Sequence, residues 1–155
     1  MNKLLLIDGH SILNRAFYGV PDLTNAEGLH TNAVYGFLNI MLKILEEEKA
    51  DHLAVAFDLP EPTFRHKMFD AYKGTRKPMP EELREQVPLI KEALTAMEIP
   101  ILTLAGYEAD DILGTLARLC EDSGNECVIA TGDRDSLQLV SDATTVRLAT
   151  TKTGR

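Results

Sequence analysis

Carboxylates are concentrated in one short stretch of the chain, at Glu108, Asp110 and Asp111. An apolar helical pattern follows at once, so these acids fall in the first turn of a predicted helix. One or two acids there would be explained by the helix dipole, because each acid near the N-terminus stabilises a helix by roughly 0.3–1 kcal/mol. A third acid exceeds that need, and a hard divalent cation, which takes oxygen ligands from carboxylates, is the alternative explanation. This stretch alone leaves both interpretations open.

Four more acids follow apolar runs elsewhere in the chain. Asp8 closes the first run, Asp58 closes the second, and Asp133 and Asp135 follow a later one. Turn chemistry explains a single case, because Asp-Gly is a common turn pair and Gly9 follows Asp8. The recurrence of an apolar run and then an aspartate is harder to attribute to separate turns, and it indicates a shared role for these positions.

Short continuous apolar runs are typical of strands that are buried on both faces of a parallel sheet. Such strands are expected at 3–7, 52–57, 99–104, 126–130 and 145–149. Helical patterns alternate with them, at 11–18, from 31 or 32 to about 45, from 80 to about 97, and from about 109 to a stop at Gly124. The predicted fold is a three-layer, Rossmann-like α/β domain with a mainly parallel, twisted sheet and helices on both faces.

Two of the predicted helices carry apolar residues on one face, and these are expected in the core: Val34, Phe37, Leu38, Met41 and Leu45 in one, and Leu83, Val87, Ile90, Leu94 and Met97 in the other. Pro88 is expected to kink or split the second helix. The run 46–48, three glutamates, is expected to be a solvated helix end that the helix dipole disfavours.

The carboxyl ends of parallel strands share one edge of a sheet, which is where open α/β sheets bind ligands. Seven acids would converge there: Asp8, Asp58, Glu108, Asp110, Asp111, Asp133 and Asp135. Two like charges about 4 Å apart repel by on the order of 4 kcal/mol, a heavy burden on a domain about 5–15 kcal/mol stable. Proton uptake would relieve it. A divalent metal would relieve it too, and an all-oxygen site suits Mg²⁺ or Mn²⁺ better than Zn²⁺.

The segment at about 60–80 combines prolines and a glycine with interleaved basic and aromatic residues. It is too long for an ordinary connection, which favours a functional segment. Cations suit the phosphates of a single strand and rings suit its bases, although a solvated lid with no ligand is the alternative. Metal-bound carboxylates beside such a segment indicate phosphoryl chemistry, an in-line displacement by water on a nucleic acid.

Composition sets limits on these interpretations. A chain of 155 residues with 45% hydrophobic residues is long enough for one domain with its own core. A net charge of −8 argues against nucleic-acid binding through the whole surface but permits a local basic site. Two cysteines, no signal peptide and no membrane-length apolar run favour the cytoplasm. No phosphate-binding glycine loop or Ser/His/Asp grouping is evident, and the four histidines are scattered.

These residues together resemble the 5′ nuclease domain at the N-terminus of bacterial DNA polymerase I, within the flap endonuclease superfamily and its PIN-like fold. The matching stretches are residues 6–9, 15–18, 31–37, 56–58, 64–66, 72–76, 106–111 and 133–135. The resemblance implies that the seven acids bind two Mg²⁺ or Mn²⁺ ions and that Arg15, Lys73 and Arg76 act near the scissile phosphate. It implies nucleic-acid contacts from Arg15, Phe64, Arg65, Lys67, Tyr72, Lys73, Arg76 and Lys77.

The activity that the resemblance implies is that of a 5′-3′ exonuclease and 5′-flap endonuclease, which cleaves DNA and RNA primers on DNA during replication and repair. The family's domain continues for over a hundred further residues, with more aspartates and a helix-hairpin-helix element. We therefore expect residues 1–155 to be the N-terminal catalytic part, with a basic arch-like insertion at about 60–80, of a monomeric parent chain that includes a polymerase domain.

Two rival functions stay open. The first is a catalytically incomplete fragment that binds single-stranded ends and does not cut. The second is a Mg²⁺ phosphatase with an aspartyl-phosphate intermediate. That chemistry usually places a second aspartate two residues after Asp8, where this chain has His10.

Overall fold

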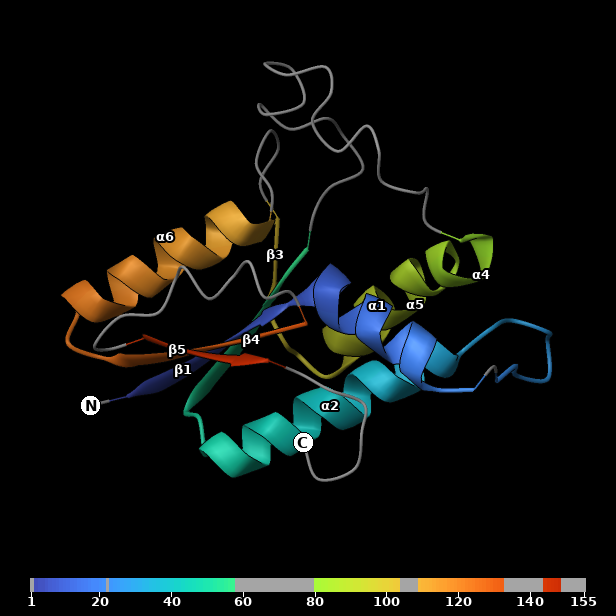
Figure 1. The fold of residues 1–155 in the computed structure, drawn as a ribbon, viewed down its shortest axis with the longest axis horizontal. Helices are drawn as coiled ribbons and strands as arrows, with labels where there is room; N and C mark the ends of the chain where they lie inside the picture. Colours follow the sequence, from blue (N-terminus) through green and yellow to red (C-terminus); the bar gives the residue numbers. More distant parts are fainter. Residues whose placement is uncertain (1, 22, 58–79, 104–108, 133–143, 149–155) are drawn as a thin grey trace, which may run out of the picture.

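The computed structural model describes residues 2–21, 23–57, 80–103, 109–132 and 144–148, with only the backbone at Asp110. Five strands form one parallel sheet in the order β3-β2-β1-β4-β5 (Figure 1). Their bounds are β1 Lys3–Asp8, β2 His52–Ala56, β3 Ile101–Leu102, β4 Glu126–Thr131 and β5 Thr144–Leu148. The prediction of a parallel α/β sheet is confirmed.

The edge strand β3 is shorter than the predicted strand at 99–104. It pairs with β2 through Val55–Ile101 and Ala56–Leu102. The Pro100 carbonyl accepts a hydrogen bond from the Val55 N–H at 3.0 Å. Because proline has no N–H, Pro100 cannot donate the next hydrogen bond to β2, and the pairing stops on the N-terminal side of β3. Residue 104 lies outside the described part of the chain.

Helices cover both faces of the sheet, which confirms the three layers. They are α1 Gly9–Gly19, α2 Asn32–Glu48, α4 Glu81–Arg84, α5 Gln86–Ala96 and α6 Ala109–Asp122. Alternation along β1 divides the core, because successive strand residues point to opposite faces. Leu5 and Ile7 lie in the cluster with residues of α1, α2 and α5, whereas Leu6 lies in the cluster with α6. Figure 1 shows α6 on the opposite side of the sheet from α2.

The predicted helix after residue 80 is divided in two, but Pro88 is not where it breaks. The break lies at Glu85, between α4 and α5. Pro88 is the third residue of α5, within the first turn, where backbone N–H groups have no partner inside the helix and a missing donor costs little. Met97 follows the end of α5 and is 44% exposed, so its predicted core position is wrong.

The end of α6 is where the sequence places it. Gly124 has a φ of +78°, a left-handed conformation that favours glycine. The Gly124 N–H donates to Glu121 O at 2.9 Å, and the Asn125 N–H donates to Cys120 O at 3.0 Å. This pair of bonds is the Schellman arrangement, which satisfies the last carbonyls of the helix and turns the chain directly into β4.

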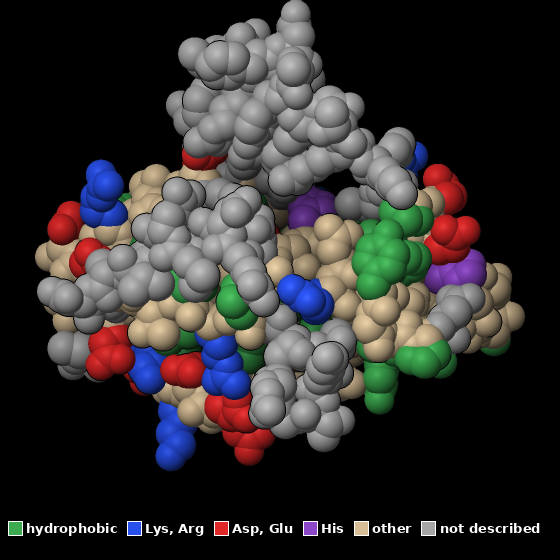
Figure 2. Space-filling view, in the orientation of Figure 1, with side chains coloured by type: hydrophobic (Ala, Val, Ile, Leu, Met, Phe, Trp, Pro, Cys, Tyr) green, Lys and Arg blue, Asp and Glu red, His purple; other side chains and the backbone are tan. Residues whose placement is uncertain are grey.

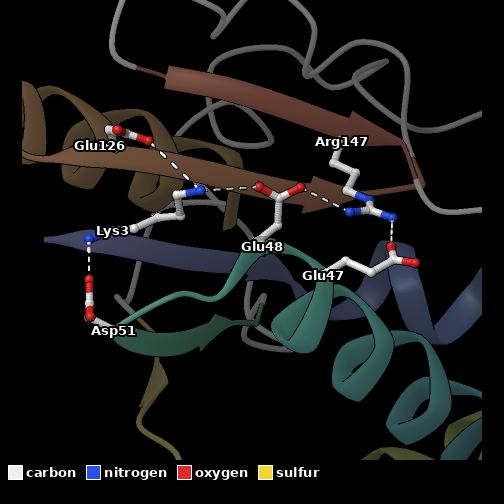
Figure 3. A network of polar contacts seen from close by, with 6 residues as sticks. All are labelled: Lys3, Glu47, Glu48, Asp51, Glu126 and Arg147. Carbon is white, nitrogen blue, oxygen red and sulfur yellow. Dashed lines mark hydrogen bonds and ion pairs between the residues drawn. The ribbon is translucent and has the colours of Figure 1, made fainter.

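The three glutamates at the end of α2 are not simply a solvated helix end, which corrects the prediction. Acidic and basic side chains are interspersed over this end of α2 (Figure 2). Arg147 of β5 bonds Glu48 Oε2 at 2.9 Å and also bonds Glu47, while Lys3 Nζ lies 3.6 Å from Glu48 Oε1 (Figure 3). The cations offset the unfavourable position of two acids at a helix C-terminus. They also attach both β1 and β5 to α2.

Burial lowers the pKa of the Arg147 guanidinium, but hydrogen bonds and charges from Glu47 and Glu48 outweigh burial, so the pKa is raised above its ordinary value. Arg147 is therefore a permanent cation in this network. Among the helices that the structure describes, none has the length and apolar character needed to span a bilayer.

Candidate active site at the carboxyl ends of the strands

Asp8 is the best-defined member of the predicted site. It ends β1, pairs in register with Ala56 of β2, and is only 6% exposed. The chain passes directly from Asp8 into α1, so Asp8-Gly9 is not a turn pair, which corrects that alternative. Asp8 occupies the N-cap position of α1 without a capping hydrogen bond from its side chain. Its carboxylate is therefore not explained by turn or cap chemistry.

Gly9 is needed for space rather than for an unusual backbone conformation. A Cβ atom added at Gly9 would lie 2.6 Å from a ring carbon of Phe57, the buried residue that follows β2. The His10 ring meets the same Phe57 ring edge-on, with centroids 5.2 Å apart, and Lys91 Nζ lies 5.2 Å from its centroid. Phe57 is the last described residue before Asp58, so these contacts fix where β2 leaves the sheet.

Two hydroxyl groups connect Asp8 to the end of β4. The Thr131 hydroxyl donates to Asp8 Oδ2 at 3.1 Å, and Ser11 Oγ lies 3.1 Å from Thr131 Oγ1. The Gly132 N–H donates to Ser11 Oγ. Thr131 is fully buried and Gly132 is the last described residue before Asp133. The carboxyl ends of β1 and β4 are thus joined by side chains as well as by the sheet.

Arg15 lies at the same place, one helical turn after Ser11. Its Nη2 donates to Gly132 O at 2.9 Å, and its side chain is otherwise largely exposed. A Cβ atom at Gly132 would lie 3.0 Å from Ser11 Oγ and 3.3 Å from Arg15 Nε, so glycine suits this crowded position. The structure therefore brings Arg15, predicted from the resemblance to lie near a phosphate, to the carboxyl edge beside Asp8.

The acids of α6 approach the same edge from the other face of the sheet. Asp110 and Asp111 are the second and third residues of α6, which confirms that they lie in its first turn. The helix ends beside the start of β4, and its 14 residues span about 21 Å, close to the roughly 20 Å of the six residues of β4. Its first turn therefore lies level with the end of β4. Asp111 is half-buried, and its backbone carbonyl accepts a hydrogen bond from Thr115 at 2.9 Å.

The remaining predicted site residues fall outside the described residues: Asp58, Glu108, Asp133 and Asp135 among the acids, and Phe64, Arg65, Lys67, Tyr72, Lys73, Arg76 and Lys77 in the basic segment. Within the described part of the chain, no group of three or more His, Cys, Asp or Glu side chains is arranged to hold a metal ion. The seven-acid metal site and the basic segment therefore stay predictions.

Sequence reasoning did not assign a role to Ser11 or Thr131. Both are small hydroxyl residues of a kind that occurs throughout the chain, and they are 120 residues apart. The available signal is positional: Thr131 is a polar residue at the end of an apolar strand, and Ser11 comes one turn after Asp8. That signal becomes specific only when the register places β1 beside β4.

Comparison with known proteins identifies a family and several relatives of this chain. A sequence model of the family described as 5′-3′ exonuclease, N-terminal resolvase-like domain, matches residues 3–154. The chain is 51% identical to DNA polymerase I of Bacillus subtilis over 146 residues, which cover 94% of this chain and 17% of that protein. It is 47% identical to DNA polymerase I of Caldicellulosiruptor bescii over 150 residues, covering 97% and 18%. The chain thus spans less than a fifth of the length of these relatives.

Solved structures share the fold. The T5 5′-exonuclease with bound zinc ions superposes with a TM-score of 0.70 at 22% identity, covering 93% of this chain and 54% of that one. The bacteriophage T5 flap endonuclease in a complex with DNA and metal ions gives a TM-score of 0.69 at 21% identity, with 93% and 54% covered. At this identity the likeness shows the fold. The match of the family model over residues 3–154 establishes that this chain belongs to the 5′-3′ exonuclease family, as its N-terminal resolvase-like domain.

Proposed function

We propose that this chain is the N-terminal catalytic part of a metal-dependent 5′-3′ exonuclease and 5′-flap endonuclease that hydrolyses phosphodiester bonds. The observation that carries the proposal is the buried Asp8 at the carboxyl edge of the sheet, with Arg15 beside it at the end of β4. Family membership supports the same reaction. The proposed substrates are DNA with a 5′ end or flap and RNA primers on DNA, in cytoplasmic replication and repair.

The donor set at this edge fits a hard divalent cation. Asp8 is a buried carboxylate to which a neutral hydroxyl donates, and Asp111 lies in the first turn of α6, level with the end of β4. Oxygen ligands of this type suit Mg²⁺ or Mn²⁺. When bound, such ions supply an activated water and stabilise the leaving oxygen. Asp8, Asp58, Glu108, Asp110, Asp111, Asp133 and Asp135 are the proposed ligands of two ions.

The chain's own cation orients the substrate. A guanidinium carries five N–H donors in a planar fork, and Arg15 directs one of its nitrogens to Gly132 O. That bond holds the guanidinium at the edge, where its other donors can contact phosphate oxygens, a geometry for which arginine is well suited. Lys73 and Arg76 are proposed to act on the same phosphate, and the rest of the basic segment to bind the strand.

The proposed parent protein includes a polymerase domain and the remainder of the nuclease domain, because the polymerase relatives are more than five times longer than this chain. We propose that it is a monomer. A fragment that binds nucleic acid without cutting it is the alternative. The phosphatase rival is less well supported, because His10, at the position of the second aspartate, packs its ring on Phe57.

The test is single-turnover cleavage of a 5′-labelled flap duplex by the full chain, in Mg²⁺ and in EDTA, with a blunt duplex of the same sequence for comparison. The proposal expects Mg²⁺-dependent release of the flap and a 5′-phosphate on the remaining strand. Binding of the flap without product would favour the fragment alternative. Turnover of a simple phosphate monoester in place of flap cleavage would favour the phosphatase.

A further inference from the structure

The hydrogen bonds around Asp8 have a fixed direction. An ionised carboxylate only accepts, so the single hydroxyl proton of Thr131 is directed to Asp8 Oδ2. Thr131 Oγ1 must then accept in its contact with Ser11, and the Ser11 hydroxyl is the donor there. Ser11 Oγ in turn accepts from the Gly132 N–H. Three donors therefore point in sequence from the backbone N–H of Gly132, the residue after β4, to the carboxylate at the end of β1.

From this arrangement we infer that Thr131 and Ser11 are positioning residues, which hold Asp8 in the geometry needed to bind a divalent cation. The inference rests on the proposed function and deepens it. Neither residue need touch the metal or the nucleic acid. Hydrogen bonds to a ligating carboxylate restrict its rotamers and orient its remaining lone pairs, and outer partners of this type matter nearly as much as the ligands themselves.

Ser11 gives the arrangement a second consequence. Arg15 follows Ser11 by four residues, so both side chains lie on the same face of α1. Both also bond Gly132: Ser11 Oγ accepts from the Gly132 N–H, and Arg15 donates to the Gly132 carbonyl at 2.9 Å. One turn of α1 therefore holds Asp8, Arg15 and the end of β4 in fixed positions relative to one another. A site assembled from two strands and a helix needs such fixed positions, because small displacements of its groups reduce the reaction rate strongly.

The decisive variant is Thr131→Val, which keeps the branched shape and removes the hydroxyl. We expect the Mg²⁺ concentration for half-maximal cleavage to rise by about tenfold to a hundredfold, as for loss of an outer partner of a metal ligand. The KM for the flap duplex should stay within about twofold, because Arg15 and the basic segment are intact. Thr131→Ser, which restores the donor, should recover most of the Mg²⁺ response. Ser11→Ala should raise the Mg²⁺ requirement less than Thr131→Val does.

Thr144→Val is a matched control. Thr144 is also a buried threonine, 1% exposed, and its hydroxyl donates to a carboxylate, Glu121 Oε1, at 2.6 Å. It lies at the start of β5, where it pairs with Cys127 near the amino ends of the strands. The same chemical change at this position should leave the Mg²⁺ requirement unaltered. Urea unfolding of each variant in EDTA reports any general loss of stability.

Calorimetric titration of each full chain with Mn²⁺ gives a readout that does not depend on cleavage, and the same order of affinities is expected. A wild-type Mg²⁺ response in Thr131→Val would overturn the positioning role while leaving the proposed nuclease in place. An equal loss in Thr131→Val and Thr144→Val would also overturn it. Wild-type protein that neither cuts nor binds Mn²⁺ would overturn both proposals together.

Discussion

Two polar networks of this molecule treat carboxylates in opposite ways. At the end of α2, Glu48 meets two cations, Lys3 and Arg147, in a partly exposed group (Figure 3). At the carboxyl ends of β1 and β4, the buried Asp8 accepts a hydrogen bond from the neutral hydroxyl of Thr131. Both networks connect parts of the chain about a hundred residues apart. The first neutralises acids within the protein, whereas the hydroxyl bond at Asp8 orients a charge without cancelling it.

The two networks differ in what they contribute: the ion pairs at α2 serve the fold, and the buried carboxylate at Asp8 serves the proposed function. Partly exposed ion pairs contribute little each, typically 0–1 kcal/mol, so the α2 network fixes the orientation of elements more than it determines total stability. A buried carboxylate has a large desolvation cost, and a hydroxyl bond recovers only part of it. A buried carboxylate at the carboxyl end of a strand fits the proposed role of Asp8 in binding a cation. The predictions below test that contrast, from the largest expected effect to the smallest.

Asp8→Asn should abolish most of the nuclease activity. Asparagine keeps the shape and an oxygen that can accept from Thr131, but it removes the charge that would bind the cation. We expect the single-turnover rate to fall by on the order of a thousandfold, more than the tenfold to hundredfold typical of outer partners. The unfolding free energy in EDTA should be unchanged or higher, since a neutral amide is cheaper to bury than a carboxylate. Flap cleavage and urea unfolding measure the two effects.

The contrast would be broken by either of two results. Cleavage within tenfold of wild type would remove Asp8 from the site. A marked drop in stability without metal, together with the loss of cleavage, would mean that the Asp8 charge serves the fold, as that of Glu48 does.

The sequence was sufficient to predict the layers and the edge of the sheet but not the hydroxyl network. Continuous apolar runs specify parallel strands, and parallel strands must end at one edge, so the place of Asp8 and of the first turn of α6 follows from pattern alone. The roles of Ser11 and Thr131 depend on the register between β1 and β4, which local pattern does not encode. A hydroxyl becomes informative only when its partner is known.

The glutamates at the end of α2 illustrate the same limit. Locally, they are acids at the unfavourable end of a helix dipole, and solvation is the natural prediction. Their partner Arg147 is 99 residues from Glu48 and belongs to an edge strand. Pro88 illustrates a different limit: its effect depends on whether it falls in the first turn of a helix, and boundaries are the least certain part of a sequence-based prediction.

Gln86→Leu tests whether the neutral, buried hydrogen bonds of Gln86 affect the proposed site or only stability. Gln86 is fully buried, and its Oε1 accepts from the Ala33 N–H at 2.8 Å while its Nε2 donates to Asn32 Oδ1 at 3.0 Å. The variant would leave backbone donors in the first turn of α2 unpaired. We expect a loss of about 2–3 kcal/mol in unfolding free energy by urea denaturation. The Mg²⁺ requirement of the folded variant should not change.

Gln86→Glu is a second variant: it keeps an oxygen for the α2 donors but loses the Nε2 donor to Asn32 Oδ1 and Glu82 O and buries a carboxyl group. If the α2 donors account for most of the loss, Gln86→Glu should be less destabilised than Gln86→Leu. A raised Mg²⁺ requirement in Gln86→Leu would show that the neutral network near α2 also serves the site, and the contrast drawn above would need revision.

Arg147→Met should reduce stability by about 1 kcal/mol, because it removes ion pairs to Glu47 and Glu48 that are only partly shielded from water. The difference from wild type should shrink in 1 M NaCl, where exposed charges are screened. Arg84→Met is the comparison variant: it breaks an ion pair with Glu81 whose side chains are 60% and 75% exposed, and it should cost less than Arg147→Met. A change in Mg²⁺ requirement with Arg147→Met, measured in the flap assay, would contradict the separation of the two networks.

The smallest effect concerns Cys127, a buried group near the start of β4, at the opposite end of the strands from Asp8. Burial, followed by the charge and hydrogen bond of Cys120, raises the pKa of the Cys127 thiol from 9.0 to about 12. Because the folded pKa is the higher one, the contribution to stability is complete below pH 9 and is lost as the pH rises from 9 towards 12. At pH 9.0 half of the unfolded thiol is ionised, which lowers the unfolding free energy by about 0.4 kcal/mol.

Cys127→Ala lacks this dependence, so its stability relative to wild type, measured by urea unfolding, should rise by that amount between pH 7 and pH 9. An unchanged difference would mean that the thiol ionises as easily inside the fold as outside it, and burial at this end of the sheet would not favour the neutral form.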